Sequence, residues 1–291
     1  AAARRPKAPT PPPQPAPEQV PPKTQPVVDQ VRRWLDTGAE DQKPPVLAQS
    51  VLGWLEKLHL TDDRAGIEAL FGVLGEAARA ERPEVRRRAW AMALLLTEKP
   101  PAVIAPTVAE CLAFAVEQAL EAEKDEECTT KAIATASRQL AGFVAHGSYV
   151  LANRILWGVF RRLQTGGSRG IAQAAKEAVE KCAAIPELAV LIETAAAEED
   201  GPAGARSAAC REFLLALGQH AAIPVFNALR RLDPLPARRV LARVLKDLGP
   251  QAEKEVVKEI NPFGNSRELV RLYEVLEILR GDVAGLAIAG F

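Results

Sequence analysis

The apolar residues of this chain recur at helical spacing from Pro26 onward. Runs of about 12 to 20 residues, in which every third or fourth position is apolar, are separated by short turns. No stretch shows the convincing alternation of apolar and polar residues that a half-buried strand requires. The pattern therefore predicts an all-α fold made of many short helices.

Prolines and capping residues mark where several of these helices begin and end. A proline is tolerated in the first turn of a helix because its missing N–H would have no partner there. Apolar-periodic runs start near Pro83, Pro186, Pro224, Pro234 and Pro250. Caps are predicted at Asp233, at Asn265 with Glu268, and at the pair Gly147-Ser148.

The C-terminal part of the chain contains an internal repeat. A shift of 31 residues superposes apolar positions at i, i+3, i+4 and i+7, which lie on one helix face. These columns are Cys210, Leu241 and Leu272; Phe213, Val244 and Val275; Leu214, Leu245 and Leu276; and Leu217, Leu248 and Leu279. The register continues through Ala221, Ala252 and Val283, through Val225, Val256 and Ala287, and through Phe226, Val257 and Ile288. One unit is therefore a helix, a turn and a second helix. A further copy precedes these at a spacing of 38, where Ala183-Ala184-Ile185-Pro186 matches Ala221-Ala222-Ile223-Pro224.

A helix pair of this size cannot bury its apolar face alone. Adjacent copies must stack and share a continuous core, which predicts an α-α superhelix, that is, an α-solenoid of antiparallel helix pairs. The competing interpretation is a helical bundle whose amphipathic helices match by chance in an Ala-rich chain. Seven columns aligned across three copies favour the solenoid.

Two segments of the chain resemble the HEAT-repeat family, in its short HEAT-like form. Pro83-Glu84-Val85-Arg86-Arg87-Arg88-Ala89 is similar to the family's entry to its second helix, a Pro or Asp turn followed by Val-Arg-x-x-Ala. The segment from Pro236 to Leu245, followed by Leu248-Gly249, resembles a second instance, with Ala237 in place of Val. Arg206 falls one position out of register, so the resemblance covers about half of the chain. It implies a curved, HEAT-like stack that holds other macromolecules.

The first 26 residues differ in composition from the rest. They hold ten of the 23 prolines and almost no residue that could anchor a core, so we expect them to stay extended and solvated. The sequence thus predicts a Pro-rich disordered linker over 1–26 and a HEAT-like domain over 27–291, within a longer multidomain protein. The alternative is that this segment is a ligand for an aromatic-groove domain, because Pro-x-x-Pro occurs in it.

Composition and charge exclude several classes of protein. The 37 basic residues balance the 37 acidic ones, which argues against a histone-like or polybasic membrane protein. The four cysteines are too far apart for a disulfide framework or a zinc site. The longest uncharged stretch is shorter than a membrane span, and no signal peptide is recognisable. We therefore expect a cytoplasmic protein that does not enter a membrane.

The sequence contains little that could support catalysis. Phosphate-loop, dinucleotide, zinc-protease and nucleophile-elbow motifs are missing, and the three histidines are far apart. No catalytic, cofactor-binding or metal-ligating residue is predicted. The segment from Thr165 to Gly170 could bind an anion at a helix start, or could be a turn in which Ser168 is the N-cap. The acidic run from Glu117 to Glu127 is interpreted as a solvated helix end.

Basic residues between 205 and 246 form the candidate interaction face. Arg239, Arg243 and Lys246 recur at i, i+4 and i+7 beside the apolar stripe, so they share one exposed helix face. Such a surface suits phosphates or an acidic partner, and Arg86 to Arg88 and Arg161-Arg162 would extend it. The other interpretation is a solvated face with structural arginines. The candidate residues are Arg206, Arg230, Arg231, Arg238, Arg239, Arg243 and Lys246.

These observations predict a non-enzymatic scaffold or adaptor that binds a protein partner through the inner surface of the solenoid. One alternative is nucleic-acid binding along the Arg-rich face, as in the HEAT-like DNA-alkylation glycosylases, although that family's catalytic aromatic and acidic residues cannot be placed in this sequence. A third hypothesis is an enzyme resembling the HEAT-like phycobilin lyases.

Overall fold

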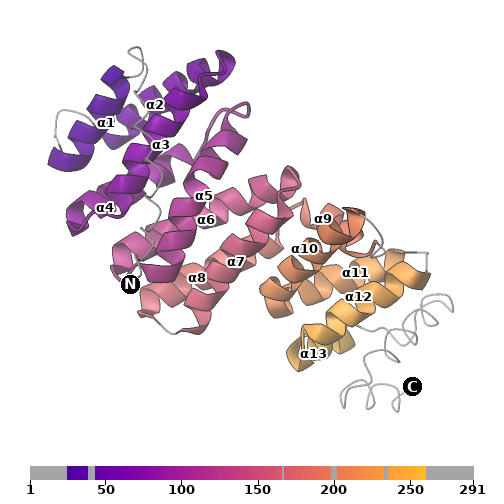
Figure 1. The fold of residues 1–291 in the computed structure, drawn as a ribbon. Coiled ribbons are helices and arrows are strands. Elements are labelled where there is room, and N and C mark those ends of the chain that lie inside the picture. Colours follow the sequence, from indigo (N-terminus) through magenta and orange to yellow (C-terminus); the bar gives the residue numbers. More distant parts are fainter. Residues whose placement is uncertain (1–24, 39–42, 166, 198–201, 233–234, 260–291) are drawn as a thin grey trace, which may run out of the picture.

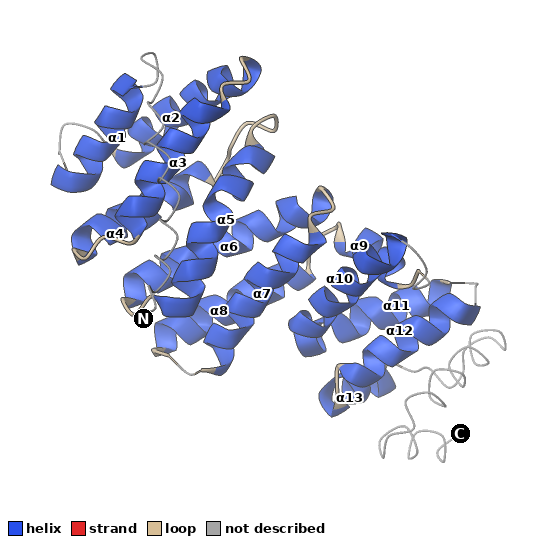
Figure 2. Cartoon of the chain, viewed as in Figure 1, coloured by secondary structure: helices blue, strands red, loops and turns tan. Residues whose placement is uncertain are grey.

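A computed structural model describes residues 25–38, 43–165, 167–197, 202–232 and 235–259. Every regular element in this part of the chain is a helix, and short loops join the helices (Figure 2). The helices are α1 (Gln25–Thr37), α2 (Pro44–Leu60), α3 (Arg64–Ala78), α4 (Pro83–Leu96), α5 (Ala105–Ala122), α6 (Glu126–Ala145), α7 (Tyr149–Gln164), α8 (Arg169–Ala183), α9 (Leu188–Ala195), α10 (Pro202–Leu217), η1 (Gly218–Ala221), α11 (Ala222–Arg231), α12 (Leu235–Asp247) and α13 (Pro250–Lys258). The predicted all-α fold is confirmed.

The helices form two layers of side-by-side neighbours. In the first layer α1, α3, α5, α7, α10 and α12 pack one against the next, and in the second layer α2, α4, α6 and α8 do the same. The second layer continues through η1, α11 and α13, while the short helix α9 lies against α10 and α11. Figure 1 shows α1 and α13 at opposite ends of the stack. This extended arrangement is a helical solenoid, and a closed bundle is excluded.

The sequence repeat matches the packing in the copies that the structure describes. Cys210, Phe213, Leu214 and Leu217 of α10 are fully buried, and the aligned residues Leu241, Val244 and Leu245 of α12 are buried as well. The matched pairs Ala221/Ala252 and Val225/Val256 are also buried, but Val257, which aligns with the buried Phe226, is only half-buried. The positions 272 to 288 lie outside the described residues. Leu248, which aligns with the fully buried Leu217, is half-buried too. The 31-residue register is therefore confirmed at most aligned positions of these two copies. The further copy at a spacing of 38 is wrong, because it matches α8 of the second layer with α10 of the first.

Most helix starts lie where the prolines predicted them. Pro83 and Pro250 are the first residues of α4 and α13, and Pro224 is the third residue of α11. Pro186 instead lies in the turn before α9, which begins at Leu188. Asp233, Pro234, Asn265 and Glu268 lie outside the described residues.

Gly147 ends α6 as the sequence predicted. Its φ of +74° is in the left-handed region, where a side chain would be strained. The N–H groups of Gly147 and Ser148 donate to the carbonyls of Val144 and Phe143, at 3.1 and 2.8 Å. This pattern is a Schellman motif. Ser148 occupies the N-cap of α7, but its hydroxyl accepts no bond from the first turn.

The helical domain begins slightly earlier than the sequence suggested. The first helix starts at Gln25 instead of residue 27, because Pro26 is accommodated in its first turn. Residues 1–24 lie outside the described part. None of the described helices is both long and apolar enough to cross a membrane.

Candidate functional site

Some residues of the predicted basic face are exposed, whereas others contact neighbouring groups of the protein. Arg239, Arg243 and Lys246 of α12 are exposed, and the buried Leu241, Ala242, Val244 and Leu245 lie on the opposite side of the helix. Arg231, in the last turn of α11, is exposed as well. The three cations of α12 therefore share one exposed surface, as their spacing in the sequence predicted.

Three other residues of the predicted basic face contact an aromatic ring or a backbone carbonyl of this chain. The Arg206 guanidinium lies 5.0 Å from the centre of the Tyr149 ring and donates to its hydroxyl at 3.4 Å. Arg230 lies over the Phe226 ring at 5.8 Å, and Arg238 donates to the Leu232 carbonyl at 3.2 Å. These contacts hold helix ends and neighbouring helices together.

Of the residues predicted to extend the basic face, Arg161 is exposed, whereas Arg86, Arg87, Arg88 and Arg162 bind groups of neighbouring helices. Arg162 donates to the carbonyls of Leu120, Ala119 and Glu123, so it caps the C-terminal end of α5. Arg88 donates in the same way to Leu35 at the end of α1, at 2.6 Å. Helix C-termini carry unpaired carbonyls and a partial negative charge, which a guanidinium neutralises. These arginines therefore stabilise the stack.

The acidic run is only partly a solvated helix end, since Glu121, Glu126 and Glu127 are exposed. Its central residues Glu123 and Asp125 form the turn between α5 and α6, and they bind Arg86 and Arg87 of α4 at 3.0 and 2.7 Å. Asp125 additionally accepts the N–H of Cys128 at 3.0 Å as the N-cap of α6. The bonds from Arg87 and from this N–H hold the pKa of Asp125 well below its usual range. The network ties three consecutive helices together.

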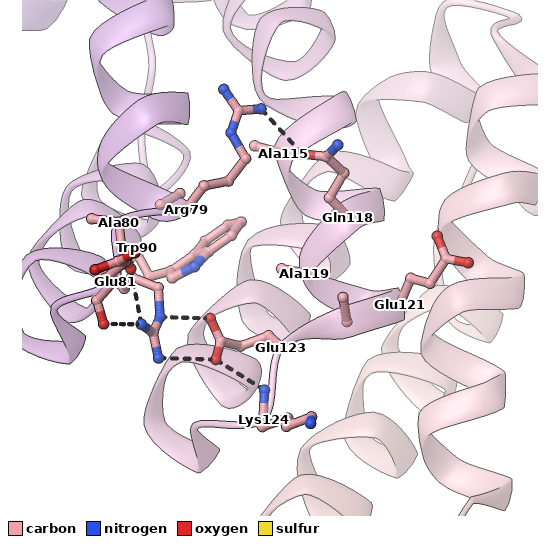
Figure 3. Close-up of a pocket in the computed structure, with 13 residues that line it drawn as sticks. Arg79, Ala80, Glu81, Trp90, Ala115, Gln118, Ala119, Glu121, Glu123 and Lys124 are labelled. Carbon is pink, nitrogen blue, oxygen red and sulfur yellow. Dashed lines mark hydrogen bonds and ion pairs between the residues drawn. The ribbon is translucent and has the colours of Figure 1, made fainter.

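A cavity of about 570 Å³ lies between the C-terminal ends of α3 and α5, above the start of α4. Arg79, at the end of α3, reaches across it and donates to Oε1 of Gln118 at 3.1 Å. On the other side Arg86 binds Glu123 through Nε and also donates to the carbonyls of Ala80 and Glu81. In the view of Figure 3 the indole ring of Trp90 lies between these two bridges. No pattern in the sequence indicated this cavity.

One polar atom in the wall of this cavity has no partner among the described residues. Trp90 is only 1% exposed, and its indole Nε1 makes no hydrogen bond within the described structure. Buried indole N–H groups are normally paired, because a donor without an acceptor destabilises the fold. This N–H is therefore an unpaired donor that is buried beneath the wall and has almost no accessible surface in the cavity.

Aromatic side chains are exposed on the outer face of the first layer. Phe114 of α5 is 60% exposed and Trp157 of α7 is 38% exposed. The rings of Trp157 and Phe160 meet edge to face, with centroids 5.6 Å apart. The two helices are held side by side by the ion pair between Arg154 and Glu117, at 2.5 Å. Phe114 does not touch the pair of Trp157 and Phe160, since the contact of Gly158 with Leu120 places it about 9 Å away along the helix axes. We call Phe114, Trp157 and Phe160 together the outer aromatic cluster.

This cluster was missed in the sequence, although a signal existed. Trp157 lies between Arg154 and Arg161 on the polar side of α7, where the helical pattern predicts a solvated residue. A large aromatic residue at such a position marks an exposed apolar site. Only the packing of α5 against α7 shows that Phe114 lies on the neighbouring helix of the same layer.

The described residues include no group of three His, Cys, Asp or Glu side chains that could hold a metal ion. Burial raises the pKa of the Cys128, Cys182 and Cys210 thiols to about 12, which keeps them in the unreactive protonated form at neutral pH. At the start of α8, Ser168 accepts the N–H of Ile171 at 3.3 Å and is therefore the N-cap.

Comparison with known proteins adds little to this description. No protein-family model and no curated protein matches the sequence. Among solved structures, the crystal structure of an engineered protein aligns with 87% of this chain and 68% of its own length. The TM-score is 0.39 and the sequence identity is 16%. The helical solenoid is therefore established by the packing of this chain's own helices.

Proposed function

We propose that this chain is a non-enzymatic protein-binding module, a scaffold or adaptor built from HEAT-like repeats. The observation that carries the proposal is the outer aromatic cluster on α5 and α7. Exposed Trp and Phe side chains are enriched at the centres of protein interfaces, because they remove a large apolar area from water at a small entropic cost. The partner meets the outer face of the first layer at Phe114 and Trp157.

The environment of Arg86 supports the HEAT-like assignment. In the segment that resembles the family, Val85 and Ala89 are buried while Arg86 between them binds Glu123 and two backbone carbonyls. One structural arginine per unit is what the resemblance implies for a HEAT-like repeat.

The charge around the cluster supports a macromolecular partner. Glu110 and Glu121 are exposed on α5, whereas Arg154 and Arg161 are exposed on α7. An apolar centre bordered by charges of both signs resembles the core and rim of a protein interface. Rim charges of this kind select and orient a partner.

The test is a comparison of partner capture by three forms of the full chain. Wild type, the double variant Phe114→Ala/Trp157→Ala and the control Leu60→Ala are immobilised and exposed to an extract of the source cells. Leu60 is a suitable control because it is 73% exposed at the end of α2, away from the cluster. We expect proteins retained by wild type and Leu60→Ala to be lost with the double variant. Equal retention by all three forms would overturn the proposal.

Nucleic-acid binding is the second candidate function, and one observation favours it. Arg239, Arg243 and Lys246 are exposed on a single side of α12. A row of cations along a helix attracts phosphates, and the attraction weakens with salt.

A further inference from the structure

A groove runs between α3 and α5 on the outer face of the first layer. A space of about 350 Å³ in it is lined by one side of α3, from Glu68 to Arg79, and by one side of α5, from Cys111 to Ala115. Gly72 lies in its wall and is exposed, and a Cβ built on Gly72 would meet no other atom within 4 Å. Gly75 lies about one turn further along the same wall. The space is therefore open where these two positions lack side chains, and we call it the outer groove.

The wall of the outer groove is apolar between two charged ends. Leu112 and Phe114 line it, and its charged residues are Glu68 and Arg79. These two lie eleven residues apart on α3, which is about 16 Å along the helix axis. Arg79 bridges the two helices at one end, because it donates to Oε1 of Gln118 (Figure 3). The outer groove is thus about as long as three turns of a helix.

The described walls favour a helical occupant over an extended one. Both walls are helices, whose N–H and C=O groups bond within their own helix. An extended peptide would therefore place its own N–H and C=O groups against apolar side chains, where they find no partner. A helix satisfies its own backbone and fills such a groove with apolar side chains at i, i+4 and i+7.

Carboxylates surround the outer groove. Glu68 and Glu76 of α3 and Glu110 of α5 are exposed, and none of them forms an ion pair with another described residue. Burial, followed by the charges of Glu110 and Glu68, raises the pKa of Cys111 in the groove wall to about 11. The negative potential of these carboxylates therefore reaches the groove, where it favours an occupant with Lys or Arg side chains.

The opposite side of Phe114 has the other charge. Helix α7 contains three arginines and no acidic residue, and both Arg154 and Arg161 are exposed on it. A basic helix is therefore repelled from the side of α7 and attracted to the side of α3. The separation of charge directs such an occupant to the outer groove.

We propose that the outer groove binds a basic amphipathic helix of a partner protein, whose apolar side chains lie over Gly72 and Gly75 against Phe114 and whose Lys or Arg side chains face Glu68 and Glu110. This inference rests on the proposed function, because it states the chemistry of the partner and the side from which the partner reaches the outer aromatic cluster.

Two synthetic helices test the chemistry of the occupant. Both are fluorescein-labelled, alanine-based and about four turns long, with leucines at i, i+4 and i+7; one carries lysines beside the leucines, and its twin carries glutamates. Fluorescence anisotropy measures the affinity of the full chain for each. At low salt we expect the lysine helix to bind at least about tenfold more tightly than the glutamate helix, and the difference to shrink as salt screens the charges. Binding of the lysine helix should also shift the ¹⁵N-amide NMR signals of Gly72 and Gly75.

Two glycine substitutions test the outer groove itself. Gly72→Leu fills the groove, and Gly53→Leu makes the same change at an exposed position of α2, where an added Cβ also meets no other atom within 4 Å. We expect Gly72→Leu to weaken binding of the lysine helix at least about tenfold and Gly53→Leu to leave it unchanged, while neither variant unfolds at a lower temperature than wild type. Equal affinity for the two helices, including no binding of either, would overturn the proposal. Equal binding of the lysine helix by the two variants would overturn it as well.

A failure of this proposal differs from a failure of the proposed function. If Gly72→Leu still captures the proteins that Phe114→Ala/Trp157→Ala loses, the proposed function stands and the inference about the outer groove is overturned. Equal capture by wild type and by the double variant is the outcome that overturns the proposed function itself.

Discussion

Asp125 has two roles that can be separated by mutation. Its carboxylate accepts the N–H of Cys128 as the N-cap of α6 and also binds Arg87 of α4 at 2.7 Å. A cap contributes about 1 kcal/mol, and an ion pair that is partly exposed adds about 0.2–1 kcal/mol. Asp63 is a suitable comparison, because it caps α3 through Gly66 and forms no ion pair seen among the described residues.

We expect Asp125→Ala to lower the free energy of unfolding by about 1–2 kcal/mol, and Asp63→Ala by about 1 kcal/mol. Urea denaturation at pH 7 measures both. Because the folded pKa of Asp125 is lowered, its contribution is fully present above the ordinary value near 3.8 and is lost as the pH falls through the folded pKa. The loss of unfolding free energy caused by Asp125→Ala should therefore become smaller as the pH is lowered below about 3.8. A cost that is independent of pH would contradict this explanation.

The cysteines provide a second prediction at this scale. Burial raises the pKa of Cys111 to about 11 and that of the other three thiols to about 12. Only the thiolate reacts with alkylating agents, so at pH 8 the native thiols should react at least about a hundredfold more slowly than free cysteine. Mass spectrometry should find Cys111 modified first, because it alone of the four described cysteines is half-buried. Rapid labelling of Cys182 in the native protein would contradict the packing described.

At the scale of the helix, Gly158 allows α7 to pack closely against α5 in the first layer. A Cβ at this position of α7 would lie 2.9 and 3.1 Å from Cδ1 and Cβ of Leu120 on α5. Those distances are too short, so the glycine is required where the two helices meet. At Gly53, in the middle of α2, an added Cβ would meet no other atom within 4 Å.

Replacing each of these two glycines with alanine should therefore change the free energy of unfolding in opposite directions. Gly53→Ala should stabilise the protein by about 0.5–1 kcal/mol, because alanine favours a helix over glycine. Gly158→Ala should destabilise it by about 1–3 kcal/mol, because α5 and α7 must separate or Leu120 must shift. Thermal and urea unfolding of the two variants measure the difference. A gain in stability for Gly158→Ala would show that this crossing has room for a methyl group.

At the scale of the whole molecule, exposed charges of both signs occur along the described stack. The exposed cations of α12 lie near one end of the described stack, and the exposed carboxylates of α5 lie near its middle (Figure 1). Arg86, Arg88 and Arg162 are occupied by carbonyls and carboxylates. Other exposed cations are spread over the described helices, for example Arg32 of α1, Arg161 of α7 and Lys176 of α8.

The row of cations on α12 by itself would give only a weak affinity for DNA. Three phosphate contacts by Arg239, Arg243 and Lys246 give a slope of log K against log salt no steeper than about −3. We expect weak binding of labelled duplex DNA in fluorescence anisotropy, lost at physiological salt. Arg239→Glu/Arg243→Glu should abolish what remains. A much steeper slope would place nucleic-acid binding ahead of protein binding.

The chain's apolar periodicity was sufficient to predict its helices. Short-range rules placed Pro83 and Pro250 at helix starts and Gly147 at a helix end, and the 31-residue repeat identified the buried faces of α10 and α12. These features depend on backbone geometry and on burial, both of which act over a few residues. The same reasoning missed the start of α9, because a proline preceding a helix need not lie within it.

The sequence by itself determined the helices, their buried sides and therefore the stacked all-α fold. The roles of polar residues were decided only by the tertiary structure. Arg86 and Glu123 are 37 residues apart in sequence, and Phe114 and Trp157 lie on different helices, so no local pattern relates them. The packing of separate helices decides whether an arginine is free or caps a distant helix. It also decides whether helices of unequal length leave a cavity beside Trp90.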